Sequence, residues 1–167
     1  HRLLTTLKNG STLKDVPNLL FHEEGKVESN EERVELRFEQ MPPPTFDGLP
    51  MDLYLSPYPI LPVLQSRGCY WGKCTFCTHS FIYGHRYGKQ RTGKMVDELE
   101  SLGKKYKTKY FTFSDEAVSP HSLNDVSEEI IKRDVDITSL ALLKFEKVMD
   151  QELFKKMKRA GFIFLMY

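Results

Sequence analysis

The sequence predicts an α/β protein built on a parallel sheet. After residue 62 a strand–loop–helix unit occurs three times, and a fourth strand closes the series. The strands are short β-rich runs, and the helices between them carry apolar residues three or four positions apart. The expected strands cover residues 62–65, 110–113, 137–143 and 162–167.

Each of the three helices has signals at its ends. Thr92, Ser119 and Asp150 are placed to cap the N-termini, and Pro120 stands at a first helical position. Gly161 follows the third helix, where a glycine commonly ends a helix. The apolar residues expected to face the sheet are Val96, Leu99, Leu102 and Tyr106, then Leu123, Val126, Ile130 and Ile131, then Leu153, Phe154 and Met157.

Residues 1–62 are expected to form a small β-rich and Pro-rich extension before a core domain at 63–167. Residues 18–22 and 26–28 flank a Glu-Glu-Gly turn, which predicts a hairpin, and residues 33–38 alternate like a half-buried strand. Residues 41–62 are rich in proline, which favours an extended connector over a helix or a central strand. The apolar residues available to pin this connector to the core are Phe46, Leu49, Leu53 and Tyr54.

The composition is that of a globular protein, with 40% hydrophobic residues, 28% charged residues and a net charge of +1. This balance gives no general attraction to nucleic acid or to a membrane. No apolar run approaches the roughly 20 residues that span a bilayer, and residues 1–10 do not read as a signal peptide. The chain starts at His1 and stops at Tyr167 inside an apolar run, so we expect a fragment of a longer protein.

Three cysteines lie within nine residues, as Cys69, Cys74 and Cys77 in the spacing C-x4-C-x2-C. An odd number of clustered thiols does not suit a secreted disulfide framework, and it indicates a reducing, cytoplasmic location and a bound metal. Thiolates are soft ligands that suit iron–sulfur clusters and zinc. Gly68 and Gly72 allow the backbone to curl closely around such a centre.

The spacing alone leaves three interpretations of these thiols open. A structural zinc ion normally has four protein ligands, and His79 would complete a Cys3His site in a binding module without catalysis. A [4Fe–4S] cluster held by three cysteines instead leaves one iron open to a substrate or cofactor. The third interpretation is that the three cysteines are incidental buried residues. A non-catalytic scaffold domain with degenerate cysteines is a further alternative to an enzyme.

The segment Gly-Cys-Tyr-Trp-Gly-Lys-Cys-Thr-Phe-Cys at 68–77 follows a short strand and resembles the cluster loop of radical SAM enzymes. It is most similar to the group often fused to an N-terminal cobalamin-binding domain. The resemblance extends to residues 13–18, 49–62, 80–84, 113–116 and 144–147. Four residues separate the first two cysteines here, whereas the commonest spacing in that family is three.

The resemblance implies that Cys69, Cys74 and Cys77 hold a [4Fe–4S] cluster whose open iron binds S-adenosylmethionine (SAM). Reductive cleavage of SAM would give a 5′-deoxyadenosyl radical, with the electron supplied by a donor such as flavodoxin or ferredoxin. The substrate, a small molecule or a modified macromolecule, stays unidentified, and cobalamin would lie in a domain outside this chain. The implied fold is the N-terminal half of a partial (βα)6 barrel. We therefore expect a fragment that is inactive alone and that either dimerises through its open sheet edge or is only marginally stable.

Four further residues are expected to contact SAM by the same resemblance. Phe76 occupies a position that packs near the adenine. Asp115 and Glu116 follow the second strand, where polar groups contact the methionyl amine, and an acidic pair suits an ammonium group. Lys144 ends the third strand, within reach of the SAM carboxylate or ribose. Without the resemblance, Phe76 reads as a core residue, the acidic pair as a favourable charge near a helix N-terminus, and Lys144 as a solvated lysine.

The predicted strand ends also bring distant residues together. Right-handed crossovers place the carboxyl ends of parallel strands at one edge of the sheet, and the loops at that edge hold the active site in such folds. The cysteine segment, the acidic pair and residues 144–147 are therefore expected to converge in space.

Overall fold

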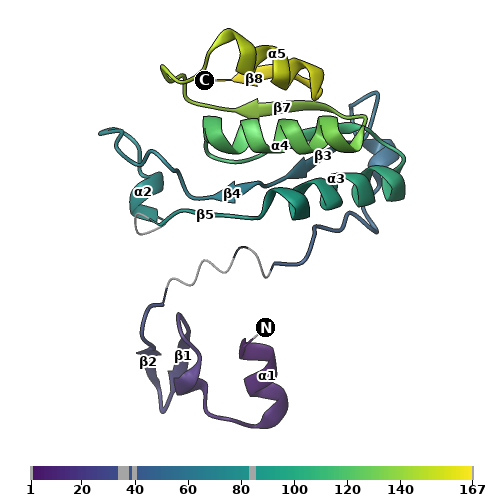
Figure 1. Ribbon diagram of the computed structural model, residues 1–167. Helices are drawn as coiled ribbons and strands as arrows, with labels where there is room; N and C mark the ends of the chain where they lie inside the picture. Colours follow the sequence, from purple (N-terminus) through teal and green to yellow (C-terminus); the bar gives the residue numbers. More distant parts are fainter. Residues whose placement is uncertain (1, 34–37, 39–40, 83–85, 167) are drawn as a thin grey trace. The chain divides into compact units, whose positions relative to one another are not determined.

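A computed structural model describes residues 2–33, 38, 41–82 and 86–166 of the chain (Figure 1). The chain divides into two compact units, His1–Glu35 and Leu36–Tyr167. Residues 34–37 of the strand predicted over 33–38 lie outside the described part.

The first unit contains a short helix and a hairpin. Its elements are α1 (Arg2–Asn9), the 3-10 turn η1 (Leu13–Asp15), β1 (Leu20–Glu23) and β2 (Lys26–Ser29). The strands pair antiparallel, which confirms the predicted hairpin, and the turn residues Glu24 and Gly25 both have positive φ, at 50° and 79°. The side chain of Asn30 donates hydrogen bonds to the carbonyls of Leu13 and Val16 (2.7 and 2.8 Å), which ties the hairpin to η1.

The second unit is built on a four-stranded parallel sheet, which confirms the predicted α/β class. The strands lie in the order β3-β6-β7-β8, the same as their order along the chain. They are β3 (Ile60–Val63), β6 (Tyr110–Phe113), β7 (Thr138–Leu142) and β8 (Phe162–Met166).

The first strand of this sheet differs from its prediction. It was expected over residues 62–65, but it begins at Ile60 and ends at Val63, so Pro62 lies inside the strand and not at its start. A proline has no N–H to donate, so it interrupts the hydrogen bonding of a central strand, which pairs on both sides. Among the described strands β3 pairs only with β6, so it is an edge strand and tolerates Pro62.

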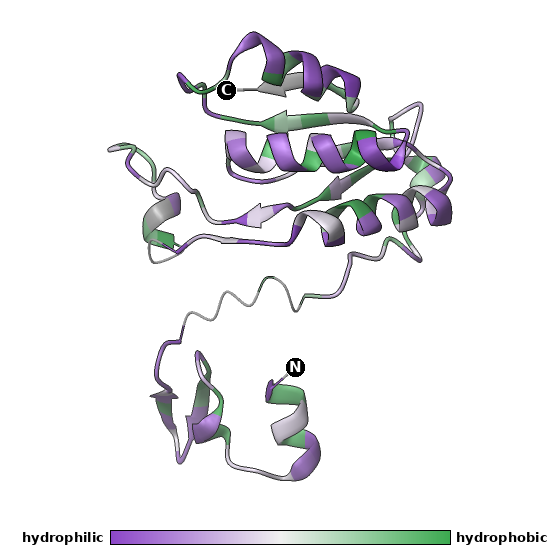
Figure 2. Cartoon of the chain, viewed as in Figure 1, coloured by the Kyte–Doolittle hydropathy of each residue, from purple (hydrophilic) through white to green (hydrophobic). Residues whose placement is uncertain are grey.

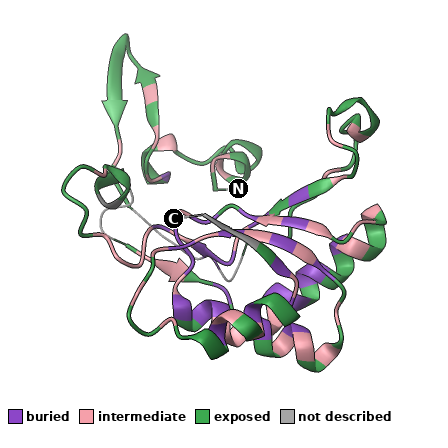
Figure 3. Ribbon diagram, turned by 90° about the horizontal axis from the view of Figure 1, so that it is seen from above, coloured by how far each residue is buried: buried purple, intermediate pink, exposed green. Residues whose placement is uncertain are grey.

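Three helices follow the first three strands and lie on one face of the sheet, as Figures 1 and 3 show from two directions. They are α3 (Thr92–Tyr106), α4 (Pro120–Arg133) and α5 (Gln151–Arg159). Each helix carries hydrophobic residues among hydrophilic ones (Figure 2), and the predicted apolar positions are buried or partly buried against the core. No helix within the described residues combines the length and apolar character needed to cross a bilayer.

Two of the three predicted caps are confirmed. The side-chain oxygens of Ser119 and Asp150 each accept an amide N–H from the first turn of their helices. The third prediction is wrong by one position, because Thr92 is already helical and the residue with extended φ and ψ before it is Arg91. Gly161 has φ +93° directly after α5, as expected of a glycine that ends a helix.

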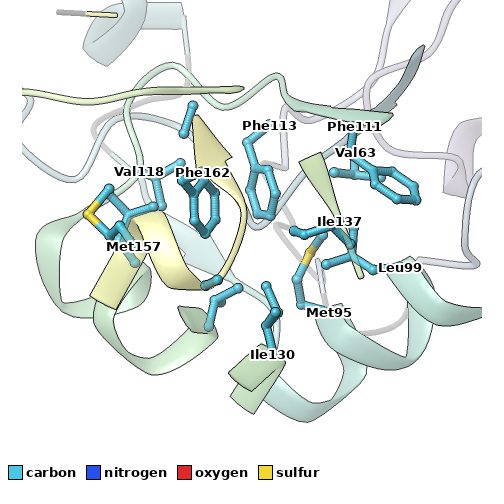
Figure 4. Close-up of a cluster of buried hydrophobic side chains, with 14 of the residues drawn as sticks. Val63, Met95, Leu99, Phe111, Phe113, Val118, Ile130, Ile137, Met157 and Phe162 are labelled. Atoms are coloured by element: carbon cyan, nitrogen blue, oxygen red, sulfur yellow. The ribbon is translucent and has the colours of Figure 1, made fainter. Parts of the chain in front are cut away.

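The core lies between the sheet and the three helices (Figure 4). Leu61, Met95 and Phe113 are fully buried there, and the rings of Phe113 and Phe162 lie 5.2 Å apart. Strand residues on the opposite face, such as Ile60, are partly or wholly exposed. The sheet therefore has one covered face and one that the described residues leave partly open.

The Pro-rich connector contacts the C-terminal end of α3. The ring of Phe46 packs edge-on against Tyr106 with centroids 5.5 Å apart, and the Phe46 N–H donates to the Tyr106 hydroxyl at 2.7 Å. The prediction that Phe46 pins the connector is confirmed. Leu49, Leu53 and Tyr54 remain exposed.

Candidate functional site

The three cysteines lie on a loop, residues 68–87, that leaves and rejoins the sheet through a short stem. The stem pairs β4 (Ser66–Arg67) antiparallel with β5 (Gly88–Lys89), and the short helix α2 (His79–Ile82) lies inside the loop. Below the stem, the Gln90 N–H donates to the Gln65 carbonyl at 3.0 Å, and the Gln65 side chain donates to the Gln90 carbonyl at 3.2 Å. The cysteine loop therefore begins and ends at one place.

Glycine is required where the cysteine loop begins. Gly68 has φ +82°, and a Cβ atom at this position would lie 2.2 Å from the Arg86 carbonyl oxygen. Gly72 also has positive φ, at 58°. A side chain at Gly68 would force the two ends of the loop apart, and the positive φ of Gly72 is a conformation that glycine adopts without strain.

The three thiols are accessible and are not joined in disulfides. Cys69 and Cys77 are half-buried, and Cys74 is exposed. The Cys77 N–H donates to the Cys74 carbonyl at 3.2 Å, so these two residues lie on one tight turn. Since none is buried, packing does not explain the cysteines, and the interpretation as three core residues is wrong.

The donor chemistry of this loop suits a soft metal or an iron–sulfur cluster, since three accessible thiols stand within nine residues. In this structure, however, the three thiols do not converge on one point. Nowhere in the described ranges are three His, Cys, Asp or Glu side chains grouped closely enough to hold a metal ion. His79 is exposed at the start of α2.

Asp115 lies just past the end of β6 and is fully buried. Its Oδ1 accepts hydrogen bonds from the backbone N–H and the hydroxyl of Ser66, both at 2.5 Å, and its Oδ2 accepts from the Gln65 N–H at 3.1 Å. Burial raises the pKa of Asp115 to about 6, against the opposing effect of these hydrogen bonds. Because Asp115 is fully buried, the predicted contact with the SAM amine would require this carboxylate to become accessible.

Glu116, the next residue, is placed differently. Its side chain is half-buried, and its Oε2 atom is buried without a hydrogen-bond partner among the described residues. A buried carboxylate oxygen without a donor is costly, so this atom is suited to receive a donor from a bound molecule. Of the two predicted acidic residues, Glu116 has the vacant acceptor.

The loop after β7 reaches the cysteine loop through two aromatic residues. The Lys144 Nζ lies 3.8 Å from the centroid of the Trp71 ring, and the Tyr70 hydroxyl donates to Glu146 Oε1 at 2.5 Å. Burial and the Glu146 carboxylate raise the pKa of Tyr70, so its phenol stays protonated and donates. With the Asp115 bonds, these contacts confirm that the three predicted segments converge at the carboxyl edge of the sheet.

Phe76 is not part of the core, because 89% of its surface is exposed. Phe81 and Ile82, on the same loop, are also exposed. The interpretation of Phe76 as a core residue is therefore wrong, and its predicted contact with adenine stays a prediction.

A cavity of about 580 Å³ opens beside the Tyr70–Glu146 hydrogen bond. The N-terminal ends of α4 and α5 form its other walls, through Ser119, Asn124 and Leu153 among others. The cavity therefore adjoins the place where the cysteine loop meets the loop after β7.

Sequence reasoning singled out the acidic pair and Lys144, but it missed the partners that hold the loop: Ser66, Tyr70, Trp71 and Glu146. Tyr70 and Trp71 carried a usable signal, since large aromatic side chains beside a ligand residue need something to pack on. Ser66 had no such signal, because its role depends on a carboxylate 49 positions away.

Comparison with curated proteins finds one similar protein. The chain is 29% identical over 163 residues to an uncharacterized methyltransferase of Pyrococcus horikoshii. The match covers 95% of this chain but only 35% of the relative. The chain matches no protein-family model. No solved structure matches it either.

Proposed function

We propose that this chain is the cluster-binding part of a radical SAM enzyme, in which Cys69, Cys74 and Cys77 hold a [4Fe–4S] cluster. The observation that carries the proposal is that three accessible thiols stand within nine residues of one loop. They are accessible on a glycine-shaped loop at the carboxyl edge of a parallel sheet, where loops of α/β enzymes carry their active sites. Three thiolates leave one iron of such a cluster open to SAM.

The sheet topology favours the N-terminal half of a (βα)6 barrel over a doubly wound sheet. Strands that follow one another in chain order, with the helices on one face, are typical of barrels, whereas doubly wound sheets carry helices on both faces. We propose that the partly open face of the sheet is the inner wall of that barrel, completed by chain beyond this one.

The residues at this edge would bind and orient SAM. Glu116 would accept a hydrogen bond from the methionyl ammonium group through its vacant Oε2. Lys144 would turn from Glu146, 3.9 Å away, toward the SAM carboxylate. Phe76 offers an exposed ring for the adenine. The chemistry that the cluster supplies when bound is the one-electron cleavage of SAM, with the electron coming from a flavodoxin or ferredoxin.

The relative extends the proposal to the reaction class. Because that protein carries the description of a methyltransferase, we propose methyl transfer as the reaction of the whole protein to which this chain belongs. Cobalamin, held outside this chain, would be the methyl carrier.

Anaerobic reconstitution with iron and sulfide tests the proposal. The reduced protein should give the EPR signal of a [4Fe–4S] cluster, and addition of SAM should change it. Cys74→Ser should lose the cluster, whereas Thr75→Ala, a neighbouring exposed position, should keep it.

Other outcomes decide against the proposal. Stoichiometric zinc at a colourless site, lost in His79→Ala, would establish the Cys3His binding module instead. Protein that takes up neither metal would indicate a scaffold domain.

A further inference from the structure

The stem of the cysteine loop is fixed to the sheet at one point. Val63 ends β3, and its carbonyl accepts the Ser114 N–H at 2.9 Å, so the ends of β3 and β6 lie level with each other. The chain then continues through Gln65 into the stem at Ser66. The next residue on the β6 side is Asp115, whose carboxylate lies against these two residues.

The Asp115 carboxylate uses both of its oxygens within the protein. Two backbone N–H groups and one hydroxyl point at it, and its exposed fraction is zero. A carboxylate is the only side-chain group of this size that accepts at both ends, so the hydrogen bonds of this site select an aspartate. An asparagine would place an NH2 group against one of the N–H donors.

Glu116 has the complementary properties. It is half-buried, and one of its oxygens lacks a partner among the described residues. Of the two adjacent carboxylates, Asp115 is thus hydrogen-bonded within the protein, and Glu116 keeps an acceptor for a bound molecule. Neither residue belongs to β6, which ends at Phe113, so the difference arises in the loop that follows the strand.

We propose that Asp115 is a positioning residue that fixes the base of the cysteine loop, and that it does not bind SAM. It would hold Ser66 and, through the stem, the direction in which Cys69 leaves the sheet. This inference rests on the proposed function of the loop, because the geometry it maintains matters only if the thiols share a centre.

The experiment measures the loop in the metal-free chain. Trp71 is the only tryptophan, so acrylamide quenching of its fluorescence reports on the cysteine loop. In Asp115→Asn we expect amide exchange at Ser66 to accelerate about tenfold, as loss of a charged hydrogen bond implies, and quenching of Trp71 to rise. Ser66→Ala should change both in the same direction by less, since it removes only the hydroxyl bond.

Ser139→Ala is the matched control. Ser139 is as buried as Ser66, and its hydroxyl donates to the Phe111 carbonyl at 3.1 Å inside the same sheet. This variant should lower stability without changing exchange at Ser66 or quenching of Trp71. If Asp115→Asn behaves like this control, the inference is overturned. If Asp115→Asn does not fold, unchanged loop readouts in Ser66→Ala overturn it instead.

Cluster reconstitution separates this inference from the proposed function. A wild-type chain that takes up no cluster while the loop readouts change as expected would remove the proposed function and keep Asp115 as the anchor of the loop. A wild-type chain that takes up the cluster while Asp115→Asn binds it with an unchanged midpoint potential and an unchanged loop would remove only the inference.

Discussion

The hydroxyl of Tyr70 donates a hydrogen bond to Glu146 across 76 positions of the sequence. Tyr70 follows the first cysteine, and Glu146 belongs to the loop after β7. Beside this bond, Lys144 lies over the ring of Trp71, the next residue along the cysteine loop. The loop is therefore held at its base by Asp115 and, just after its first cysteine, by the loop that follows β7.

Tyr70→Phe should reduce the free energy of unfolding by about 1–2 kcal/mol, because it leaves the partly buried Glu146 carboxylate without its donor. Urea denaturation of both proteins measures the difference. Tyr54→Phe is the control, since Tyr54 is 51% exposed and its hydroxyl should contribute little. Equal stabilities of the two variants would show that the Tyr70 bond contributes nothing net.

Lys144→Ala should uncover the ring of Trp71, because both the ammonium group and the aliphatic stem leave it. We expect stronger acrylamide quenching, emission at longer wavelength and a loss of stability of about 0.5–1 kcal/mol. Lys147→Ala, at an exposed position of the same loop, should change none of these. An unchanged emission spectrum in Lys144→Ala would contradict the contact.

The stability of the chain should carry a signature of Asp115 in its pH dependence. Burial raises the folded-state pKa of this carboxyl to about 6, whereas the ordinary value is 3.8. Between these values the folded protein keeps a proton that the unfolded chain has released. The contribution of Asp115 to stability therefore falls as the pH rises through this interval, by on the order of 3 kcal/mol, and stays low above it.

Comparison with Asp115→Asn isolates that contribution, because exposed carboxylates with lowered pKa, such as Asp47 and Glu128, titrate equally in both proteins. Urea unfolding at several pH values between about 4 and about 7 should show wild type losing stability relative to the variant. If the difference in the free energy of unfolding between wild type and Asp115→Asn does not vary with pH, the pKa of Asp115 is not raised in the folded protein.

Gly161→Ala should destabilise the fold by about 2 kcal/mol or more, since φ is +93° and the new Cβ would lie 2.0 Å from the Ile137 carbonyl oxygen. Gly93→Ala is the contrasting change. Gly93 lies in the first turn of α3, and its Cβ would come no nearer than 3.4 Å to Arg133 Nη2. This substitution should be neutral or raise the melting temperature, because alanine favours the helix.

Glu116→Gln should weaken the effect of SAM on the EPR signal of the reconstituted protein while leaving the cluster itself in place. The amide keeps the size of the side chain but removes the charge that would pair with the methionyl ammonium group. Glu100→Gln, on the exposed part of α3, serves as the control. A variant with full response to SAM would assign the ammonium contact to another residue.

Most of the fold could be predicted because each signal was local. Apolar residues three or four apart located α3, α4 and α5, and the side-chain caps at Ser119 and Asp150 located two of their starts. The start of β3 was missed because residues 41–62 were interpreted as a Pro-rich connector, and only the assembled sheet shows that a strand containing proline lies at an edge here.

The candidate site was predictable in its chemistry but not in its division of roles. The cysteine spacing and the acidic pair are visible in the sequence, and so is their meeting at one sheet edge. Which of Asp115 and Glu116 faces inward depends on the end of β6 and on donors 49 and 50 positions earlier. Such a relationship has no local pattern.

Because of the stem formed by β4 and β5, the length of the cysteine loop can change without changing the geometry of the sheet. Because the loop leaves and returns at paired residues, Arg67 opposite Gly88, an added or deleted residue beyond that pair does not alter the register of β3 against β6. The four residues between Cys69 and Cys74 lie beyond that pair. The span between the first two thiols can therefore change in length without disturbing the sheet that carries the loop.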